Sequence, residues 1–319
     1  MIKNGLVTLG EALIDLIPLD STNLVYQKSP GGAPANVAVG AARLGMKSTF
    51  IGKVGQDVLG EFLVETLANY GVEVTSICLT DSYRTGLVFV TLDSKGERSF
   101  SFFVKDSADL YLEETDVKEE LFINQKIFHF GTISMLQNPV REATLKAINY
   151  AKQYGMIVSF DPNVRLSLWE NENVLRETIF SLLPSVDVLK LSDEELLFLT
   201  GKEDHDGINK WMQEFNLSLV FLTKGAEGSI VFTKSGSMKV EALKVMTVDT
   251  TGAGDAFVSS FLYCLNERKR EITSITLEEA AEIAKFASVS GGLAASEKGA
   301  MSALPTLAAV HKITTGNGS

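Results

Sequence analysis

The chain between Val248 and Phe257 combines residue types that suit the transfer of a phosphoryl group. Gly252 and Gly254 allow the backbone to turn sharply just before an apolar helical stretch. Amide groups at such a helix start point toward one spot, and the helix dipole also attracts an anion there. Asp255 lies in the first helical turn, where its carboxylate could accept a proton from an attacking hydroxyl. A turn without a ligand, and an Asp that only complements the dipole, are the alternatives.

Other phosphate and metal motifs do not occur in the sequence. The P-loop pattern GxxxxGK followed by Ser or Thr is absent. Gly252-x-Gly254 continues to Phe257, where a dinucleotide-binding GxGxxG motif needs a third glycine. The three histidines lack metal-ligand spacing, and neither HExxH nor GxSxG occurs. The sequence therefore gives no support to a P-loop, a dinucleotide fold, a zinc site or a serine hydrolase.

The composition is that of an ordinary globular protein with an acidic balance. Of the 319 residues, 45% are hydrophobic and 22% are charged, and the net charge is −11 at pH 7. Such a chain is unsuited to coating nucleic acid or anionic lipid. No uncharged apolar run reaches the roughly 18 residues of a membrane span, and Glu11 and Asp15 interrupt the first apolar stretch too early for a signal peptide. Cys78 and Cys264 are predicted to be core thiols in a reducing compartment, so we expect a cytoplasmic protein.

Short apolar runs alternate with amphipathic stretches along most of the chain. The runs predicted as strands are Gly5–Leu9, Ser48–Val54, Lys126–Phe130, Ile157–Phe160, Val186–Lys190 and Leu219–Thr223. Helical patterns cover Pro34–Leu44, Asp57–Tyr70, the stretch from Asn138 to Gly155, and Ala256–Leu265. Strands that alternate with helices indicate βαβ units. The predicted fold class is therefore α/β, with a mostly parallel sheet covered by helices on both faces.

Two segments do not follow this alternation and predict a small second sheet. Leu13–Ser29 has no helical period, and Thr85–Val104 has the pattern of a hairpin that turns at Asp93–Gly96. We expect these segments, approximately 12–32 and 85–106, to form a β-sheet lid inserted in a single domain of residues 1–319. The residues predicted to give the hairpin one apolar side are Val88, Phe89, Phe100, Phe102 and Phe103. That side could close over a ligand or be buried in a homodimer.

Two segments resemble the signatures of one known family. Asp249–Phe257 resembles the carboxy-terminal signature of the ribokinase/PfkB carbohydrate kinases, and Gly31–Ala38 resembles their amino-terminal signature. The first signature is specific, because two glycines, an alanine and an aspartate must follow in a fixed order. The resemblance covers Gly5 to about Pro305. It implies a ribokinase-like α/β sandwich with a β-sheet lid, and transfer of the γ-phosphate of ATP to a sugar hydroxyl.

The resemblance also implies roles around the transferred group and the sugar. Asp255 would be the base that takes the proton of the sugar hydroxyl. The residues implied for the anion hole are Gly252, Ala253 and Gly254. Asp15 would hold sugar hydroxyls, since a carboxylate can accept from two of them at once. The residues implied for the sugar floor are Gly31, Gly32 and Asn36. From the residues alone, a solvated loop Asp and a tight turn before a helix are the alternatives.

Two further segments follow predicted strands. Arg165 comes just after the strand Ile157–Phe160, at the edge where ligands of open α/β sheets bind. Its guanidinium could contact phosphate or substrate oxygens, and a surface salt bridge is the alternative. Ser192 and Glu195 resemble the family's Asn-x-x-Glu motif, whose glutamate orders Mg²⁺ through water. Ser replaces Asn here, and Ser-x-x-Glu is also a helix capping box.

For the nucleotide, the resemblance implies ATP with Mg²⁺. The residues that it implies for nucleotide binding are Asn163, Lys190, Thr223, Lys224, Gly225, Gly228 and Gly254. It also implies a K⁺ site that includes Asp249 and Thr251, near a loop at residues 297–300.

Among the sugars of the family, Gly10–Asp15, Gly31–Ala38 and Lys190–Glu195 resemble the fructokinase branch most closely. The predicted reaction is the phosphorylation of D-fructose to fructose-6-phosphate. A sugar acid such as 2-keto-3-deoxygluconate would need a cation, which Arg98 or Arg165 could supply, and this is the main alternative. Ribokinase activity and a regulator without catalysis are further alternatives. The expected partners are the sugar and ATP, with no nucleic acid or membrane, and a second copy of the chain that joins through the lid sheets.

Overall fold

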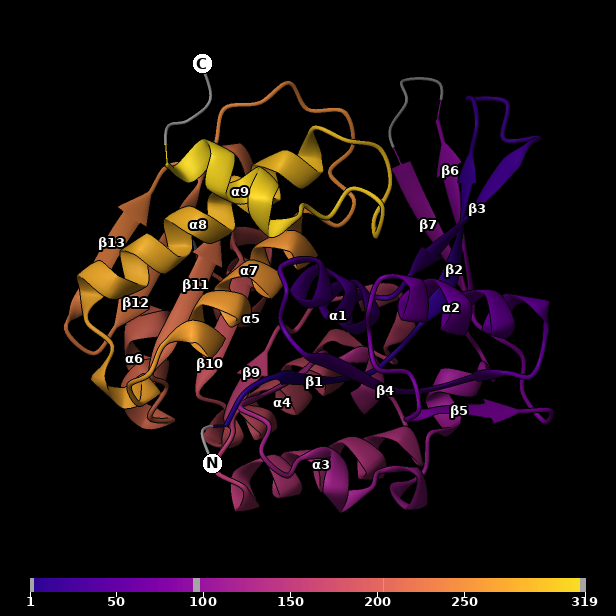
Figure 1. The fold of residues 1–319 in the computed structure, drawn as a ribbon, viewed down its shortest axis with the longest axis horizontal. Helices are drawn as coiled ribbons and strands as arrows, with labels where there is room; N and C mark the ends of the chain where they lie inside the picture. The colour runs from indigo at the N-terminus through magenta and orange to yellow at the C-terminus, as the bar shows by residue number, and fades with distance from the viewer. Residues whose placement is uncertain (1–2, 94–97, 203, 316–319) are drawn as a thin grey trace.

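The computed structural model describes residues 3–93, 98–202 and 204–315. The strands of its large sheet are β1 (Leu6–Leu9), β4 (Ser48–Gly55), β5 (Ile77–Thr80), β8 (Ile127–Phe130), β9 (Ile157–Phe160), β10 (Val188–Ser192), β11 (Leu219–Thr223), β12 (Ser229–Thr233) and β13 (Gly236–Val240). Within the described ranges these nine strands follow the order β13-β12-β11-β10-β9-β8-β1-β4-β5 (Figure 1). The strands from β11 to β5 in this order run parallel, and β12 and β13 are antiparallel additions at one edge.

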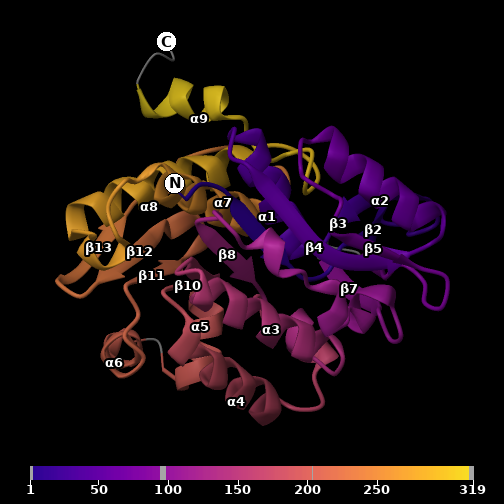
Figure 2. The ribbon, with the colours of Figure 1, turned by 60° about the horizontal axis from the view of Figure 1, so that its bottom comes forward.

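Helices cover both faces of this sheet (Figure 2). The helices on one face are α3 (Val140–Gln153), α4 (Glu172–Leu182), α5 (Asp193–Thr200) and α6 (Asp206–Glu214). Those on the other face are α1 (Ala33–Arg43), α2 (Val58–Asn69), α7 (Ala253–Glu267) and α8 (Leu277–Ala295), and α9 (Leu307–Thr314) packs on α8. Stacked rings join sheet and helix, as where Phe221 of β11 lies against Phe261 of α7. This arrangement confirms the predicted α/β fold.

The predicted boundaries agree with the structure in most places. Ile157–Phe160 and Leu219–Thr223 match β9 and β11, but the predicted strand Val186–Lys190 begins two residues before β10. Asp187 lies just before β10, and its side chain accepts a hydrogen bond from the Val158 amide (2.8 Å). Helix α7 begins at Ala253 rather than at the predicted Ala256, because the Ala256 amide already donates to the Gly252 carbonyl (2.8 Å).

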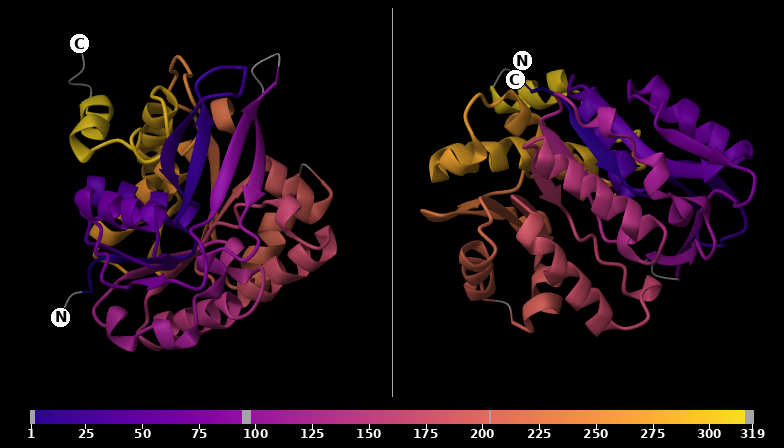
Figure 3. Two further views of the ribbon diagram at one scale, coloured as in Figure 1. Left: turned by 90° about the vertical axis from the view of Figure 1, so that its right-hand side faces the viewer. Right: turned by 90° about the horizontal axis from the view of Figure 1, so that it is seen from below.

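The lid is a separate sheet that projects beyond the layers of the main body (Figure 3). Its strands are β2 (Leu13–Pro18), β3 (Tyr26–Gly31), β6 (Leu87–Leu92) and β7 (Arg98–Phe103). Over the described residues the order is β3-β2-β6-β7, with β2 and β6 parallel and the other two pairs antiparallel. The predicted hairpin is present as β6 and β7. Of its predicted turn, residues 94–96 lie outside the described residues.

The pleat of the lid corrects one expectation about its apolar side chains. Val88 pairs with Asp15 of β2 and with Phe102 of β7, so these three side chains share the face toward the main body. Phe89 and Phe103 alternate with them and lie on the opposite face, where their rings meet edge to face (5.2 Å). The expectation of a single apolar side is therefore wrong, since successive residues of a strand point to opposite faces.

Asp57 ties the base of the lid to the main body. Its carboxylate caps α2 by accepting from the amides of Leu59 (3.0 Å) and Gly60 (2.9 Å). The same carboxylate accepts from the amide (3.0 Å) and the hydroxyl (2.9 Å) of Thr85, two residues before β6. The Thr85 hydroxyl oxygen in turn accepts from the Gly55 amide at the end of β4 (3.1 Å). One side chain thus anchors the strand that enters the lid.

Candidate active site

A cavity of about 530 Å³ lies between the lid and the carboxyl ends of β1, β9 and β10. The lid contributes an apolar wall that includes Leu13, Val88 and Phe102, and the main body contributes the polar wall. The predicted site residues that line this cavity are Asp15, Gly32, Asn36, Asn163, Arg165, Lys190, Glu195, Thr251, Gly252, Gly254 and Asp255. Residues that lie far apart in the sequence, at the ends of several strands and helices, therefore meet in one place.

The turn that the sequence predicts to bind an anion lies at the start of α7. Gly252 adopts a left-handed conformation (φ 78°), which a residue with a side chain rarely takes. The Ala253 amide turns inward and donates to the Thr250 carbonyl (3.2 Å). The next two amides, those of Gly254 and Asp255, have no acceptor among the residues that the structure describes. Two N–H groups at a helix start are thus available to an anion in the cavity.

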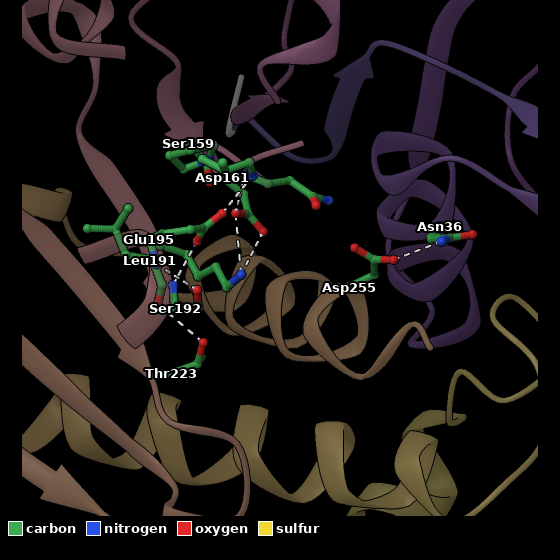
Figure 4. Close-up of polar contacts among 12 residues, drawn as sticks. Asn36, Ser159, Asp161, Leu191, Ser192, Glu195, Thr223 and Asp255 are labelled. Atoms are coloured by element: carbon green, nitrogen blue, oxygen red, sulfur yellow. Dashed lines mark hydrogen bonds and ion pairs between the residues drawn. The ribbon is translucent and has the colours of Figure 1, made fainter. Parts of the chain in front are cut away.

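The carboxylate of Asp255 lies on the cavity wall and contacts Asn36 of α1. Asn36 Nδ2 donates to Oδ2 of Asp255 at 2.7 Å (Figure 4). Burial raises the pKa of Asp255 to about 6, against the lowering effect of this hydrogen bond. A carboxylate with such a pKa is ionised at neutral pH and close to it in proton affinity, which suits a general base.

Asp15 of β2 faces the same cavity, and a glycine makes room for it. A Cβ atom on Gly31 would lie 2.3 Å from Oδ2 of Asp15, so a side chain at residue 31 would displace this carboxylate. Burial raises the pKa of Asp15 to about 6, and the charge of Asp255 adds to the shift. Gly32 has a positive φ of 103°, and a Cβ there would lie 2.4 Å from the Glu11 carbonyl. The backbone therefore requires glycine at residue 32, and Gly31 leaves space for the Asp15 carboxylate.

A buried ion pair lies below the anion-binding turn. Lys190 Nζ contacts Oδ2 (3.1 Å) and Oδ1 (3.3 Å) of Asp161, which follows β9. Burial lowers the pKa of Lys190, but the charges of Asp161 and Glu195 outweigh it and the net shift is upward. Lys190 is therefore a permanently charged ammonium, and its Nζ lies 3.9 Å from the Cβ position of Gly254.

Ser192 and Glu195 form the capping box that the sequence offered as an alternative. The Ser192 hydroxyl accepts from the Glu195 amide (3.1 Å), and Glu195 Oε2 accepts from the Ser192 amide (2.7 Å). Glu195 Oε1 also accepts from the Val164 amide (2.8 Å), which joins this helix start to the loop after β9 (Figure 4). Glu195 lines the first cavity, and each of its carboxylate oxygens has one hydrogen-bond donor from the described residues.

The two predicted arginines differ in what the structure describes. Arg165 lines the cavity, is exposed, and forms no ion pair with an acidic residue in the described ranges. The salt-bridge alternative for Arg165 is therefore wrong for those residues. Arg98 lies in β7, and its side chain is outside the described residues.

A second cavity of about 440 Å³ lies on the other side of the α7 start. Of the predicted nucleotide-binding residues, Thr223, Gly225, Gly228 and Gly254 line it. Lys190 and Asn163 line the first cavity instead, and Lys224 is paired with Glu227 (3.5 Å) outside both. Thr250 and Gly254 line both cavities, and Ala253 lines the second. The anion-binding turn therefore stands between a polar cavity and a largely apolar one.

Asp249 holds two loops together behind this turn. The side chain is 3% exposed; its Oδ1 accepts from the Thr251 amide (2.9 Å) and its Oδ2 from the Gly299 amide (3.1 Å). The two residues predicted for a K⁺ site are thus in direct contact. Across the described part of the chain, no three His, Cys, Asp or Glu side chains are grouped closely enough to hold a metal ion.

The fold and this site lead to one family. The model of the pfkB family of carbohydrate kinases matches residues 3–307. The chain belongs to the pfkB family. It is 42% identical to the probable chloroplastic fructokinase-6 of Arabidopsis thaliana, over 96% of this chain and 81% of that protein. The structure of the Xylella fastidiosa fructokinase with bound ATP superposes with a TM-score of 0.91 at 32% identity and covers both chains fully.

A second solved fructokinase, from Vibrio cholerae O395, is a double mutant with bound fructose, ADP and a potassium ion. It superposes with a TM-score of 0.88 at 39% identity and covers 98% of both chains. No helix in the described ranges is long and apolar enough to span a membrane.

Sequence reasoning missed several residues of this pfkB site. Glu11 follows β1 and lines the first cavity. Its side chain accepts a hydrogen bond from the Ala33 amide at the start of α1 (3.1 Å). Asp161 directly follows the predicted strand Ile157–Phe160, but its ion pair with Lys190 joins the ends of two strands that are distant in the sequence. Gly291 and Gly292 in α8 line the second cavity, and a Cβ on Gly292 would lie 2.9 Å from Leu243. Two adjacent glycines inside a helix are the signal that could have revealed this contact.

Proposed function

We propose that the protein is a fructokinase that transfers the γ-phosphate of ATP to the 6-hydroxyl of D-fructose. The observation that carries this proposal is the position of Asp255 and two available amides between a sugar-sized cavity and a second, largely apolar cavity. A hydroxyl in the first cavity and a phosphate extending from the second can meet at this turn. Similarity to fructokinases over nearly the whole chain supports fructose as the acceptor.

In the proposed reaction, the 6-hydroxyl oxygen attacks the γ-phosphorus while its proton passes to Asp255. The bond from the γ-phosphorus to the bridging oxygen breaks, and the electrons of that bond leave with ADP. The amides of Gly254 and Asp255 donate hydrogen bonds to the transferred group, and Gly252 and Ala253 shape the turn. Phosphoryl transfer needs alignment and charge neutralisation more than covalent chemistry, and this turn supplies both. Lys190 adds a buried positive charge close to Gly254.

Charge in the sugar cavity favours a neutral acceptor over a sugar acid. The acidic side chains that line it are Glu11, Asp15, Asp161, Glu195 and Asp255. Lys190 is already paired with Asp161, so Arg165 is the remaining cation on the described wall. A sugar carboxylate would be repelled by the charges of Asp15 and Asp255, whereas a sugar hydroxyl can donate to a carboxylate. We assign sugar binding to Asp15, Gly31, Gly32, Asn36 and Arg165, and Arg98 stays a prediction.

The second cavity is assigned to the nucleotide. Its largely apolar wall suits a planar base, and Thr223, Gly225, Gly228 and Gly254 are the proposed nucleotide contacts. Mg²⁺ would enter with the phosphates of ATP, since the described side chains form no metal cluster of their own. Bound there, it would neutralise phosphate charge, and Glu195 could contact its water shell. Asp249 and Thr251 are the proposed K⁺ region, which the potassium ion in the V. cholerae fructokinase supports.

The experiment is an ADP-release assay of the purified protein with ATP and Mg²⁺ on three acceptors: D-fructose, D-ribose and 2-keto-3-deoxygluconate. We expect kcat/KM for fructose to exceed that for the sugar acid by about 100-fold or more, because a carboxylate would face unpaired like charges. A higher kcat/KM for the sugar acid would replace the proposed substrate. Binding of fructose and ATP without turnover would indicate a regulator instead.

We also propose that the protein forms a homodimer through its lid and works in the cytoplasm. The outward face of the lid carries Tyr26, Phe89 and Phe103 in a row of ring contacts, and Phe103 is 60% exposed. Such a row favours burial against another protein surface. Cys78 and Cys264 are both free thiols, as expected in a reducing compartment.

A further inference from the structure

Asn36 has a contact that its assignment to the sugar floor does not explain. It lies in the second turn of α1, a helix that packs against α7, and its side chain is buried (5% exposed). Its Nδ2 donates to Oδ2 of Asp255 at 2.7 Å. Its Oδ1 is buried in the cavity wall and has no hydrogen-bond partner among the described residues. The NH₂ group of the amide therefore binds Asp255, and its carbonyl oxygen is available to accept a hydrogen bond.

The chemistry of the two groups fixes their orientation. An ionised carboxylate has no proton to donate, so only the NH₂ end of the amide can face it. If Asp255 were protonated on this oxygen, the same contact would require the amide to turn and present its carbonyl. Once Oδ2 is held by Asn36, Oδ1 is the oxygen that is left for the substrate, because no described residue donates to it.

We propose that Asn36 is a positioning residue for the general base: it selects the rotamer and the ionised form of Asp255 and directs Oδ1 toward the sugar hydroxyl. This inference rests on the proposed function. Its own carbonyl oxygen would accept a second hydroxyl of the same sugar, so binding of the sugar would fix the amide further.

The surroundings make this hydrogen bond important for the charge of Asp255. Burial raises the pKa of the carboxyl group, and the charges of Asp161 after β9 and Asp15 in the lid also disfavour the ionised form. Lys190 and Arg165 oppose them. Asn36 is the one group that does so through a direct contact among the described side chains. Removing the amide would therefore leave a base that is protonated over a wider pH range.

The test is the pH dependence of kcat for the wild type and Asn36→Leu, with saturating ATP and fructose. A hydrogen bond to a charged group is worth enough to move a pKa by about one unit or more. We expect the acid limb of kcat in Asn36→Leu to move to higher pH by that amount. Near pH 6, kcat should fall about fivefold or more, with recovery above pH 8. An unchanged acid limb with a raised KM for fructose would overturn the proposal and leave Asn36 as a sugar contact only.

The matched control is Asn266→Leu, which removes another buried amide at the far end of α7. Asn266 accepts from the Gly5 amide (2.8 Å) and donates to Asn4 (2.7 Å), so its loss should lower Tm and leave the acid limb in place. If Asn36→Leu does not fold, Asn36→Asp keeps the shape and should raise the pKa of Asp255 further. The carboxyl carbon of Asp255 can also be titrated by NMR without turnover. An unshifted titration contradicts the role of Asn36, whereas absent turnover in the wild type contradicts the fructokinase proposal.

Discussion

The surroundings of Asp255, the proposed general base, act on its pKa in opposite directions. Burial beside Asp15 and Asp161 favours its neutral form, whereas proton acceptance requires the charged form. The Asn36 amide and the ammonium of Lys190 offset part of the burial effect, so the pKa settles at about 6. The proton affinity of the site is thus set by groups on four different elements, and no single residue determines it.

Substitution of Asp255 should distinguish a role as general base from a role that only complements the dipole of α7. Asp255→Asn keeps the shape but cannot take a proton, so we expect kcat to fall by about 10²–10⁴-fold with little change in KM for fructose. Asp206 is the control, because it also begins a helix but is exposed and lines neither of the two cavities. Asp206→Asn should keep wild-type turnover. Equal kcat values for Asp255→Asn and the wild type in the ADP-release assay would refute the assignment.

The carboxyl group of Glu11 should make the thermal stability of the protein fall as the pH rises from about 4.5 to about 8. Burial raises the pKa of Glu11 from 4.5 to about 8, so the folded state favours the protonated form more than the unfolded state does. The stabilising effect of Glu11 is complete below about pH 4.5 and is lost as the pH rises through about 8. Glu11→Gln keeps an acceptor for the Ala33 amide and cannot ionise.

The measurement for Glu11 is Tm of both proteins between about pH 6 and pH 8.5, above the pKa of about 6 of Asp15 and Asp255. The wild type should lose Tm across this range, and Glu11→Gln should lose less. Parallel curves would show that Glu11 does not titrate there.

At the level of single residues, a fixed local pattern allowed Asp255 and the glycines of the turn to be predicted. Gly252 and Gly254, with one residue between them, and the helix start act through the local backbone, which the sequence specifies. The ion pair of Lys190 with Asp161 depends on the pairing of β10 with β9, and the contact of Asn36 with Asp255 depends on the packing of α1 on α7. Such contacts join distant segments, so no spacing rule reveals them.

Among the elements, the lid sheet has a small core of its own, so it relies on apolar packing of Ile14, Leu16 and Leu87 beside α2 and on polar anchors. The buried apolar cluster between lid strands contains only Leu13, Val88 and Val104 among the described residues. Asp57 supplies part of the missing stability through its bonds to α2 and to Thr85. The capping role of Asp57 could be predicted from the start of the helical pattern, but its second role could not, because Thr85 is 28 residues away.

The contribution of Asp57 to the free energy of unfolding can be compared with that of a residue that only caps a helix. Asn171 caps α4 through the amides of Asn173 and Val174 at 3.0 Å each, and among the described residues its side chain forms no hydrogen bond to another element. We expect Asn171→Ala to lower the free energy of unfolding by about 1 kcal/mol and Asp57→Ala by about 2 kcal/mol or more, as measured by urea denaturation. Asp57→Ala should also raise KM for fructose, since Asp15 lies on the anchored lid. Equal losses from the two variants would mean that the tie to Thr85 adds nothing.

For the molecule as a whole, alternating apolar runs and helices predicted the layers correctly, because parallel strands covered on both faces must be apolar throughout. The lid was placed correctly from its lack of helical period. The error concerned Val88, Phe89 and Phe103, which were treated as one surface although adjacent residues of a strand face opposite ways. One face closes the first cavity. The other packs beside α2 through Ile14, Leu16 and Leu87, and farther out it carries Tyr26, Phe89 and Phe103.

That outer face makes the oligomeric state testable. If the proposed dimer forms through the lid, light scattering should give twice the chain mass of 34.6 kDa, and Phe103→Ser should shift it toward the monomer. Leu145→Ser is the control, because Leu145 is also exposed (42%) but lies on α3, away from the lid. Leu145→Ser should keep the wild-type mass. Because Phe103 lies on the face away from the sugar cavity, its loss should act on turnover only through assembly. A wild-type mass of one chain would rule out the dimer and leave Tyr26, Phe89 and Phe103 as a solvent-facing surface.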